Sequence, residues 1–177
     1  MDECTSTIVS EVESLKGLVD EFSQFARMPA PKAVPTKVHE LLDESLALYD
    51  GLFADVHFER RYAPSLPLVR VDQEQLRRVV INLVDNAIEA TDRRGTVTVF
   101  TEYDREQGRV RLGVADDGPG IAPQDRDKLF VPNFSTKKQG SGLGLAIVSR
   151  ILQEHHGTIR VEDNRPRGAR FIAEIPA

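Results

Sequence analysis

The sequence predicts an α+β protein: an α/β sandwich in which one helical layer packs on one mixed sheet, preceded by an N-terminal helix. Strand-like and helix-like segments are interspersed, without the regular alternation of a doubly wound fold. A proline-rich linker at 29–35 separates a heptad-patterned segment at 1–28 from the rest of the chain, at 36–177. We therefore predict one helical segment and one globular domain.

Residues 2–27 are predicted to form a single amphipathic helix. Its apolar residues are spaced four and three apart, as in the seam of a coiled coil or helix bundle; they are Ile8, Val12, Leu15, Val19, Phe22 and Ala26. The prolines of the linker end this helix, because proline fixes φ and has no amide donor. A seam of this kind seeks a partner, so a homodimer through residues 2–27 is one expectation.

The remaining elements follow from capping residues and periodicity. Thr36 is expected to cap a helix over about 37–50, and Asp72 one that runs to about Arg93. Alternating apolar residues predict strands at 56–60, 68–71, 96–103 and 109–115. After a loop-rich stretch, a helix is expected from about Leu143 to His155, ended by Gly157, and then strands at 158–162 and 169–175.

The composition is that of a soluble globular protein, with 40% hydrophobic and 29% charged residues. The net charge of −5 disfavours a nucleic-acid partner, whose binding surface would be basic. No apolar run approaches the ~20 residues that span a bilayer, and the acidic start does not resemble a secretory signal. The single cysteine excludes an internal disulfide. We therefore expect a cytoplasmic chain.

Asn82, Asn86 and Glu89 form a polar stripe on the predicted helix at 73–93. They lie four and three residues apart, so they share one face. Amide and carboxylate oxygens of this kind can hold a hydrated Mg²⁺ ion. The alternative is the solvated face of an ordinary amphipathic helix.

The segment from Asp116 to Ile121 directly follows an apolar strand. A carboxylate at a strand end can accept a hydrogen bond from an exocyclic amine. Gly118 and Gly120 would let the backbone pass close to a flat ring. An ordinary Asp/Gly/Pro turn is the alternative.

Two further segments could bind phosphates. The glycine-rich run at 140–146 opens a helix, whose N-terminal amides attract anions. It fits neither a Rossmann fingerprint, since no strand immediately precedes it, nor a P-loop, since the lysine is missing. The segment at 129–138 ends in Lys137 and Lys138, which could reach phosphates as point charges. Its alternative is an apolar anchor followed by a solvated basic turn.

These four segments resemble, in order, the N, G1, F and G2 boxes of the GHKL ATPase/kinase superfamily, with its Bergerat fold. Gly168 to Phe171 looks like its closing glycine-containing box. The resemblance covers 36–177 and is closest to sensor histidine kinases. Residues 15–29 also resemble the second helix of the dimerisation domain in nitrogen-regulation (NtrY/NtrB-like) sensor kinases.

The resemblance implies ATP and Mg²⁺ as ligands and a role for each matching residue. Asn86 would coordinate Mg²⁺, while Asn82 and Lys137 are candidate catalytic residues facing the phosphates. Asp116 would bind the adenine amine, in a pocket shaped by Gly118 and Gly120. Residues from about 122 to 141 would form an ATP lid, in which Asn133 departs from the family's aromatic or large apolar residue. Phosphate contacts fall to Lys138, Gly140, Ser141, Gly142, Leu143 and Gly144.

The function implied is the ATP-binding catalytic region of a two-component sensor histidine kinase. Residues 1–36 contain no histidine, and His39 lies inside the catalytic domain, where an exposed helix position is expected. The γ-phosphoryl group would therefore go to a histidine on a helix absent from this chain, so autophosphorylation is not expected. The implied partners are that phosphoacceptor helix and a response regulator, and the parent would be a membrane-bound sensor.

Three alternatives remain at this stage. An ATP hydrolase of the chaperone or mismatch-repair type would place a glutamate base where Asn82 stands, and an asparagine cannot take a proton from water. A serine kinase of the anti-sigma-factor type shares the fold but would not need the coiled-coil segment. A non-enzymatic nucleotide-sensing or dimerisation module is the third.

Overall fold

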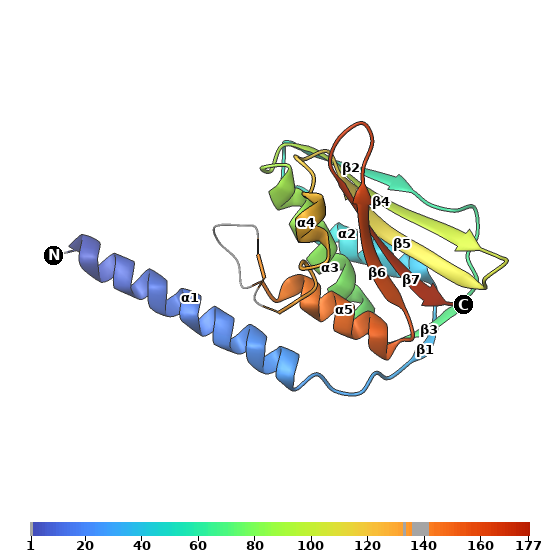
Figure 1. Cartoon of the computed structure of the whole chain (residues 1–177), viewed down its shortest axis with the longest axis horizontal. Helices are drawn as coiled ribbons and strands as arrows, with labels where there is room; N and C mark the ends of the chain where they lie inside the picture. The colour runs from blue at the N-terminus through green and yellow to red at the C-terminus, as the bar shows by residue number, and fades with distance from the viewer. Residues whose placement is uncertain (1, 133, 136–141) are drawn as a thin grey trace.

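The computed structural model describes residues 2–132, 134–135 and 142–177. Every predicted helix and strand is present in the predicted order, and two short elements, β1 and α4, were not predicted (Figure 1). The helices are α1 Asp2–Ala26, α2 Val38–Ala47, α3 Gln73–Ala90, α4 Pro123–Arg126 and α5 Gly144–Glu154. The strands are β1 Val34–Thr36, β2 Val56–Arg61, β3 Val69–Val71, β4 Gly95–Asp104, β5 Arg109–Asp116, β6 Thr158–Asp163 and β7 Ala169–Pro176.

The main sheet has five strands in the order β2-β4-β5-β7-β6. It is mixed: β2 runs parallel to β4, and every other neighbouring pair is antiparallel. Helices α2, α3 and α5 lie on one side of it (Figure 1). A separate two-stranded sheet pairs β1 with β3. The predicted α+β sandwich, with one helical layer on one mixed sheet, is confirmed.

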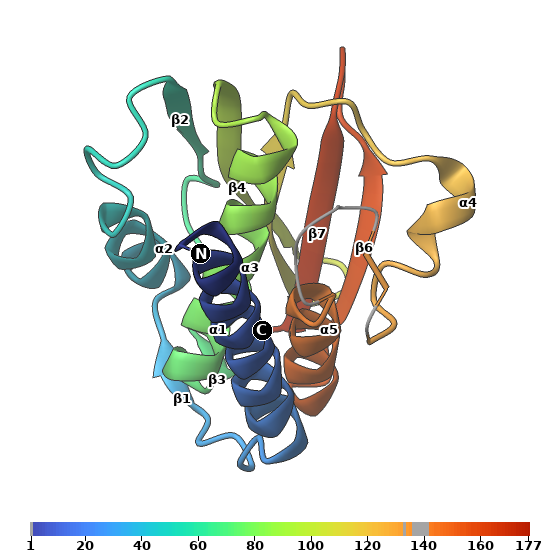
Figure 2. The ribbon, with the colours of Figure 1, turned by 90° about the vertical axis from the view of Figure 1, so that its left-hand side faces the viewer.

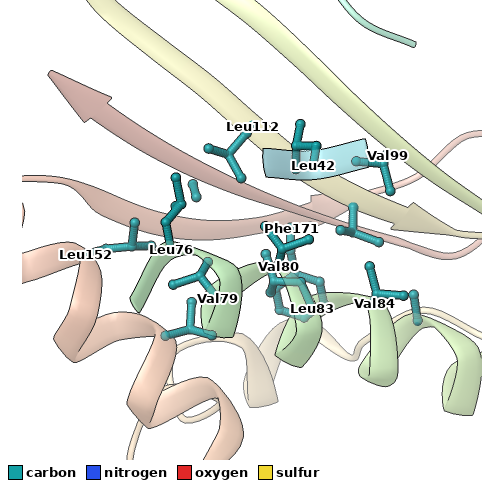
Figure 3. Close-up of a cluster of buried hydrophobic side chains, with 14 of the residues drawn as sticks. Leu42, Leu76, Val79, Val80, Leu83, Val84, Val99, Leu112, Leu152 and Phe171 are labelled. Atoms are coloured by element: carbon teal, nitrogen blue, oxygen red, sulfur yellow. The ribbon is translucent and has the colours of Figure 1, made fainter. Parts of the chain in front are cut away.

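The core lies between the sheet and the helical layer, and strand alternation decides which residues enter it. On β5, Val110, Leu112 and Val114 point toward the helices and are at most 2% exposed. Figure 3 shows Phe171 of the sheet beside Val80 and Leu83 of α3, within the same buried cluster as Leu112. Helix α3 therefore has one fully apolar face, which packs against the sheet.

The residues that alternate with the core positions carry a network of cross-strand ion pairs. The Arg111 guanidinium lies 2.9 Å from a Glu174 oxygen and 2.7 Å from an Asp104 oxygen. On the same face, the Arg170 guanidinium lies 4.1 Å from the centre of the Phe100 ring. Charged side chains thus lie on the side of the sheet opposite α3, beside a small apolar cluster of Phe100, Ala115 and Ile172.

The segment around Thr36 differs from the prediction. Thr36 does not cap α2; Lys37 is the N-cap residue and makes no side-chain capping bond. Thr36 instead belongs to β1, where it pairs with Val69, and its hydroxyl donates to the Val34 carbonyl. Strand β1 therefore begins within the predicted proline-rich linker. A proline at an edge strand loses no ladder bond, which is why Pro35 is tolerated there.

The end of α5 also differs from the prediction. Gly157 was expected to end the helix, but the left-handed residue is His156, with φ 57°. The Gly157 amide donates to the Leu152 carbonyl at 2.7 Å, and the His156 amide to Gln153 at 3.0 Å, which is a Schellman pattern. Glycine is needed at 157 for another reason: a Cβ there would overlap the Glu174 carbonyl oxygen of β7.

His39 is not the exposed helix residue that we expected. Its ring stacks on Tyr62 with the centroids 4.7 Å apart, and its Nε2 shares a 2.8 Å hydrogen bond with Thr101 Oγ1. His39 is therefore half-buried and helps to join α2, the residues after β2, and β4.

Helix α1 projects from the body and contacts it only near its C-terminal end (Figures 1 and 2). The Arg78 guanidinium of α3 donates to Gln24 Oε1 at 3.0 Å. Arg150 of α5 lies over the Phe25 ring, 5.2 Å from its centroid, and donates to the Phe25 carbonyl. The predicted seam is exposed; its members with exposed large side chains are Ile8, Val12, Leu15, Val19 and Phe22. None of the described helices is long and apolar enough to cross a membrane.

Asp72 connects the linker, α3 and α5. Its Oδ1 accepts from the Gln75 amide at 3.1 Å, so the predicted N-cap is confirmed, and its Oδ2 accepts from the Lys32 amide at 2.8 Å. The Asp72 amide donates to His155 Nε2 at 2.9 Å, while His155 Nδ1 donates to the Ile151 carbonyl. Burial by itself raises the pKa of the Asp72 carboxyl, but the backbone amides that donate to it outweigh burial and lower this pKa.

We predict that Asp72→Ala lowers the free energy of unfolding by about 1–2 kcal/mol at pH 7, since it removes the N-cap. Because the folded pKa is lowered, this stabilisation is complete above the ordinary value of 3.8 and fades as pH falls through the folded pKa. Urea unfolding at pH 7 and at pH 3 measures both effects. Asp50→Ala, at an exposed turn position, should change stability by less than about 0.5 kcal/mol. Equal losses in the two variants would contradict the capping role.

Candidate functional site

A cleft of about 1040 Å³ lies between α3, the start of α5 and the end of β5. It is lined by residues from segments that are far apart in the sequence. Six of the predicted site residues meet there: Asn82, Asn86, Asp116, Gly120, Gly142 and Gly144. The structure therefore brings the three predicted polar and glycine-rich segments to one place.

Asp116 forms one wall of the cleft. It continues the alternation of Val110, Leu112 and Val114, so its side chain points toward the helical layer, where it is 3% exposed. The Oδ1 atom accepts from the Gly118 amide at 2.9 Å and from the Ala169 amide at 3.3 Å. These bonds offset the cost of burying the carboxylate and fix its orientation, so it can accept a hydrogen bond from a ligand.

The two predicted pocket glycines have different environments. Gly120 lines the cleft and has φ 81°, a conformation that favours glycine. Gly118 lies behind the cleft wall, where an added Cβ would be 2.5 Å from the Ala90 carbonyl oxygen. Gly118 therefore allows the turn after β5 to pack against the end of α3.

The polar stripe of α3 forms the opposite wall. Asn82, Asn86 and Glu89 all line the cleft, while neighbouring apolar residues of the helix face the core. Asp85 lines it too, and was missed, although its position three residues after Asn82 could have indicated it. The Tyr49 hydroxyl donates to Asp85 Oδ1 at 2.7 Å. Burial, and then this bond, raise the pKa of Tyr49, so the hydroxyl remains a donor.

The oxygen atoms that this wall offers as metal ligands suit Mg²⁺ better than a transition metal. The amide and carboxylate side chains of Asn82, Asn86 and Glu89 offer oxygen ligands beside a cleft that is open to water. Within the described residues there is no group of three His, Cys, Asp or Glu side chains that could enclose a metal. A magnesium ion that keeps several waters and shares its ligands with a phosphate fits this arrangement.

The first turn of α5 lies beside Asn82. Leu143 is the N-cap residue, and its own apolar side chain makes no capping bond. An added Cβ at Gly144 would be 3.2 Å from Asn82 Oδ1, so the helix N-terminus and the polar stripe are neighbours. The Leu143 side chain is 1% exposed in the core, which leaves its predicted phosphate contact to its backbone. A helix N-terminus in this position attracts an anion.

Part of the predicted site lies outside the described residues. These positions are Asn133, Lys137, Lys138, Gly140 and Ser141. The described part of the predicted lid contains α4, which we had not expected, and the Phe130 ring, which meets Phe171 edge-on with centroids 6.4 Å apart.

The other end of the cleft reaches the end of α1 and the residues just after it, where Glu21, Gln24 and Met28 line it. Sequence analysis did not predict these residues. Their place depends on the linker folding back, with the Gln75 side chain donating to the Pro29 carbonyl at 3.1 Å and the Lys32 amide held by Asp72. No local pattern indicates such a contact.

Residues 71–177 match the family described as histidine kinase-, DNA gyrase B-, and HSP90-like ATPase. The sensory histidine kinase/phosphatase NtrB of Rhodobacter capsulatus is 36% identical over 98% of this chain. The chain spans 52% of that protein, or about half of its length.

Two solved structures share the fold over almost the whole chain. Full-length ShkA in complex with AMPPNP superposes with a TM-score of 0.82 and 31% identity, covering 98% of this chain and 39% of ShkA. The histidine kinase ThkA in complex with the response regulator TrrA superposes with a TM-score of 0.81 and 30% identity, covering 96% of this chain and 49% of the other.

Proposed function

The chain belongs to the histidine kinase-, DNA gyrase B-, and HSP90-like ATPase family, as an ATP-binding catalytic domain of the sensor histidine kinase type, and we propose that it holds Mg²⁺-ATP in this cleft for phosphoryl transfer to a histidine. One observation carries the proposal. A buried carboxylate lies at one wall of the cavity, and the N-terminus of α5 lies beside a polar stripe at the other. The carboxylate suits the amine of a nucleobase, and the helix N-terminus with the polar stripe suits phosphates and their metal ion.

At the base end, Asp116 accepts a hydrogen bond from the exocyclic amine of adenine. Its carboxylate is already oriented by the Gly118 and Ala169 amides, so little ordering is needed when the base binds. Guanine presents a carbonyl oxygen where adenine has the amine. Two acceptors would then face each other in a buried site, which disfavours GTP.

At the phosphate end, the backbone amides at Gly142 and Gly144, which line the cleft at the N-terminus of α5, donate to phosphate oxygens. Asn86 contributes an amide oxygen to Mg²⁺, and Asn82 lies between this position and the helix N-terminus. Bound Mg²⁺ would neutralise charge on the phosphates. Lys137 and Lys138 are included in the proposal as cationic partners of the phosphates.

The phosphoryl acceptor is proposed to be a histidine on a helical hairpin to which α1 contributes one helix. Residues 1–36 contain no histidine. The exposed apolar seam of α1 supports both a partner helix and a homodimer. The complex of ThkA with TrrA supports a response regulator as the later acceptor, and a cytoplasmic location fits such a partner. The asparagine at 82 supports transfer over hydrolysis, because an amide cannot act as a general base.

We predict that Asp116→Ala weakens ATP binding by about 1–3 kcal/mol, because the adenine amine loses its buried acceptor. Asp50→Ala is the control, because it removes an exposed carboxylate that does not line the cleft. Calorimetry with ATP and GTP on the natural sequence and both variants gives the affinities. If the natural sequence binds ATP and GTP with equal affinity, Asp116 does not distinguish adenine from guanine, which would be evidence against its proposed role.

We predict that Asn86→Ala reduces the gain in ATP affinity that Mg²⁺ provides, and leaves the affinity in chelator nearly unchanged. The physical reason is the loss of one oxygen ligand, with the base and phosphate contacts kept. ATP titrations with Mg²⁺ and with EDTA separate the two quantities. Gln153→Ala, an exposed amide on α5, serves as control. If Asn86→Ala keeps the full Mg²⁺-dependent gain, Asn86 is not a ligand.

We predict that the chain with γ-labelled ATP and Mg²⁺ does not label itself, but labels a histidine-bearing hairpin supplied in trans. Transfer requires the acceptor to be held in line with the γ-phosphate, so positioning provides most of the catalysis. The label should be acid-labile and base-stable, and Asp116→Ala should reduce it. Label of this kind on the chain alone would contradict the prediction.

A further inference from the structure

The hairpin loop between β6 and β7, residues 164–168, is hydrogen-bonded to the turn that carries Asp116. Pairing of β5 with β7 runs from Arg109↔Pro176 to Ala115↔Arg170, so Asp116 lies just beyond the last paired residue on that side. In place of a ladder bond, the Asn164 side chain donates from Nδ2 to the Asp116 carbonyl at 2.8 Å. A side chain thus holds the strand end where the sheet stops.

A second side chain of the same loop holds the other end of the turn. Arg167 Nε donates to the Gly118 carbonyl at 2.8 Å. The loop is closed by the Asn164 amide, which donates to the Gly168 carbonyl at 3.0 Å. Two donors from one loop therefore fix the carbonyls on both sides of Asp117.

The close approach of the two chains depends on Gly168. Its φ is 106°, a conformation that favours glycine, and an added Cβ would overlap the Asp116 carbonyl oxygen. The next residue, Ala169, supplies one of the two amides that donate to Asp116 Oδ1. The loop thus bonds the backbone of Asp116, and the residue that follows the loop bonds its carboxylate.

Asn164 and Arg167 do not line the nucleotide cleft. Both line a shallower hollow of about 640 Å³ that includes the turn at 119–122 and the loop at 163–168. An effect of these side chains on a ligand in the cleft must therefore pass through the turn that they hold.

We propose that Asn164 and Arg167 are positioning residues for base recognition: they hold the Asp116–Gly118 turn so that the Asp116 carboxylate meets the adenine amine. The inference rests on the proposed function of the cleft. It extends that function from the residues that face the nucleotide to a loop that does not. The energetic effect of Asn164 should then require the Asp116 carboxylate, whereas a general packing role would not.

The test is a double-mutant cycle with ADP binding and thermal unfolding as readouts. Asn164→Ala and Arg167→Ala should each weaken ADP binding roughly two- to tenfold, the range for one lost hydrogen bond. Arg165→Ala is the matched control, because it removes the same charge from the same loop and makes no hydrogen bond within the described residues. In an Asp116→Ala background, adding Asn164→Ala should change ADP affinity by less than about twofold. The reason is that Asn164 would act through the Asp116 carboxylate, which this background lacks, and two mutations that remove the same interaction are not additive.

The outcomes are separable. If Asn164→Ala weakens ADP binding equally in the natural and Asp116→Ala backgrounds, the role is general packing and the proposal is wrong. Unchanged affinity in both loop variants also overturns it, while the function of the cleft stands. If Asn164→Ala does not fold, the double-mutant cycle of Arg167→Ala with Asp116→Ala tests the proposal in its place. Failure of the natural sequence to bind ADP overturns the proposed function and, with it, this inference.

Discussion

The burial of the Asp116 carboxylate is the constraint on which the site depends. A carboxyl group removed from water costs folding free energy unless it receives hydrogen bonds. The Gly118 and Ala169 amides provide them, and each requires a close approach of backbone segments. Gly118 and Gly168 make these approaches possible, because a Cβ at either would meet a carbonyl oxygen. The turn after β5, the end of α3 and the β6–β7 loop are thus shaped around one side chain.

Helix α3 joins the stability of the domain to its function. Its apolar face, including Leu83 and Val84, is fully buried against the sheet, and its polar face lines the cleft. The two faces cannot move independently, so core packing holds Asn82 and Asn86 in place. The Tyr49 hydroxyl adds a contact from the residues after α2 to the cleft wall at Asp85. A rigid scaffold of this kind suits a reaction in which positioning dominates.

The end of α1 is held by side chains of the catalytic domain and not by the linker alone. Arg78, Gln75 and Arg150 contact the stretch at 24–29, and the same stretch borders the cleft. The remainder of α1 presents its apolar seam to solvent. These contacts fix the direction of α1 at its C-terminal end.

By itself, the sequence determined the order of the longer helices and strands, the α3 cap at Asp72 and the polar stripe of α3. These follow from periodicity and capping, which depend on neighbouring residues only. Tertiary structure alone decided that Thr36 joins a strand, that His156 and not Gly157 turns left-handed, that Tyr49 supports Asp85, and that the loop at 164–168 holds Asp116. Each of these features except the helix end joins residues far apart in the chain. At the helix end, Gly157 is required by its contact with β7. Contacts of this kind form only when the layers pack, and no local pattern encodes them.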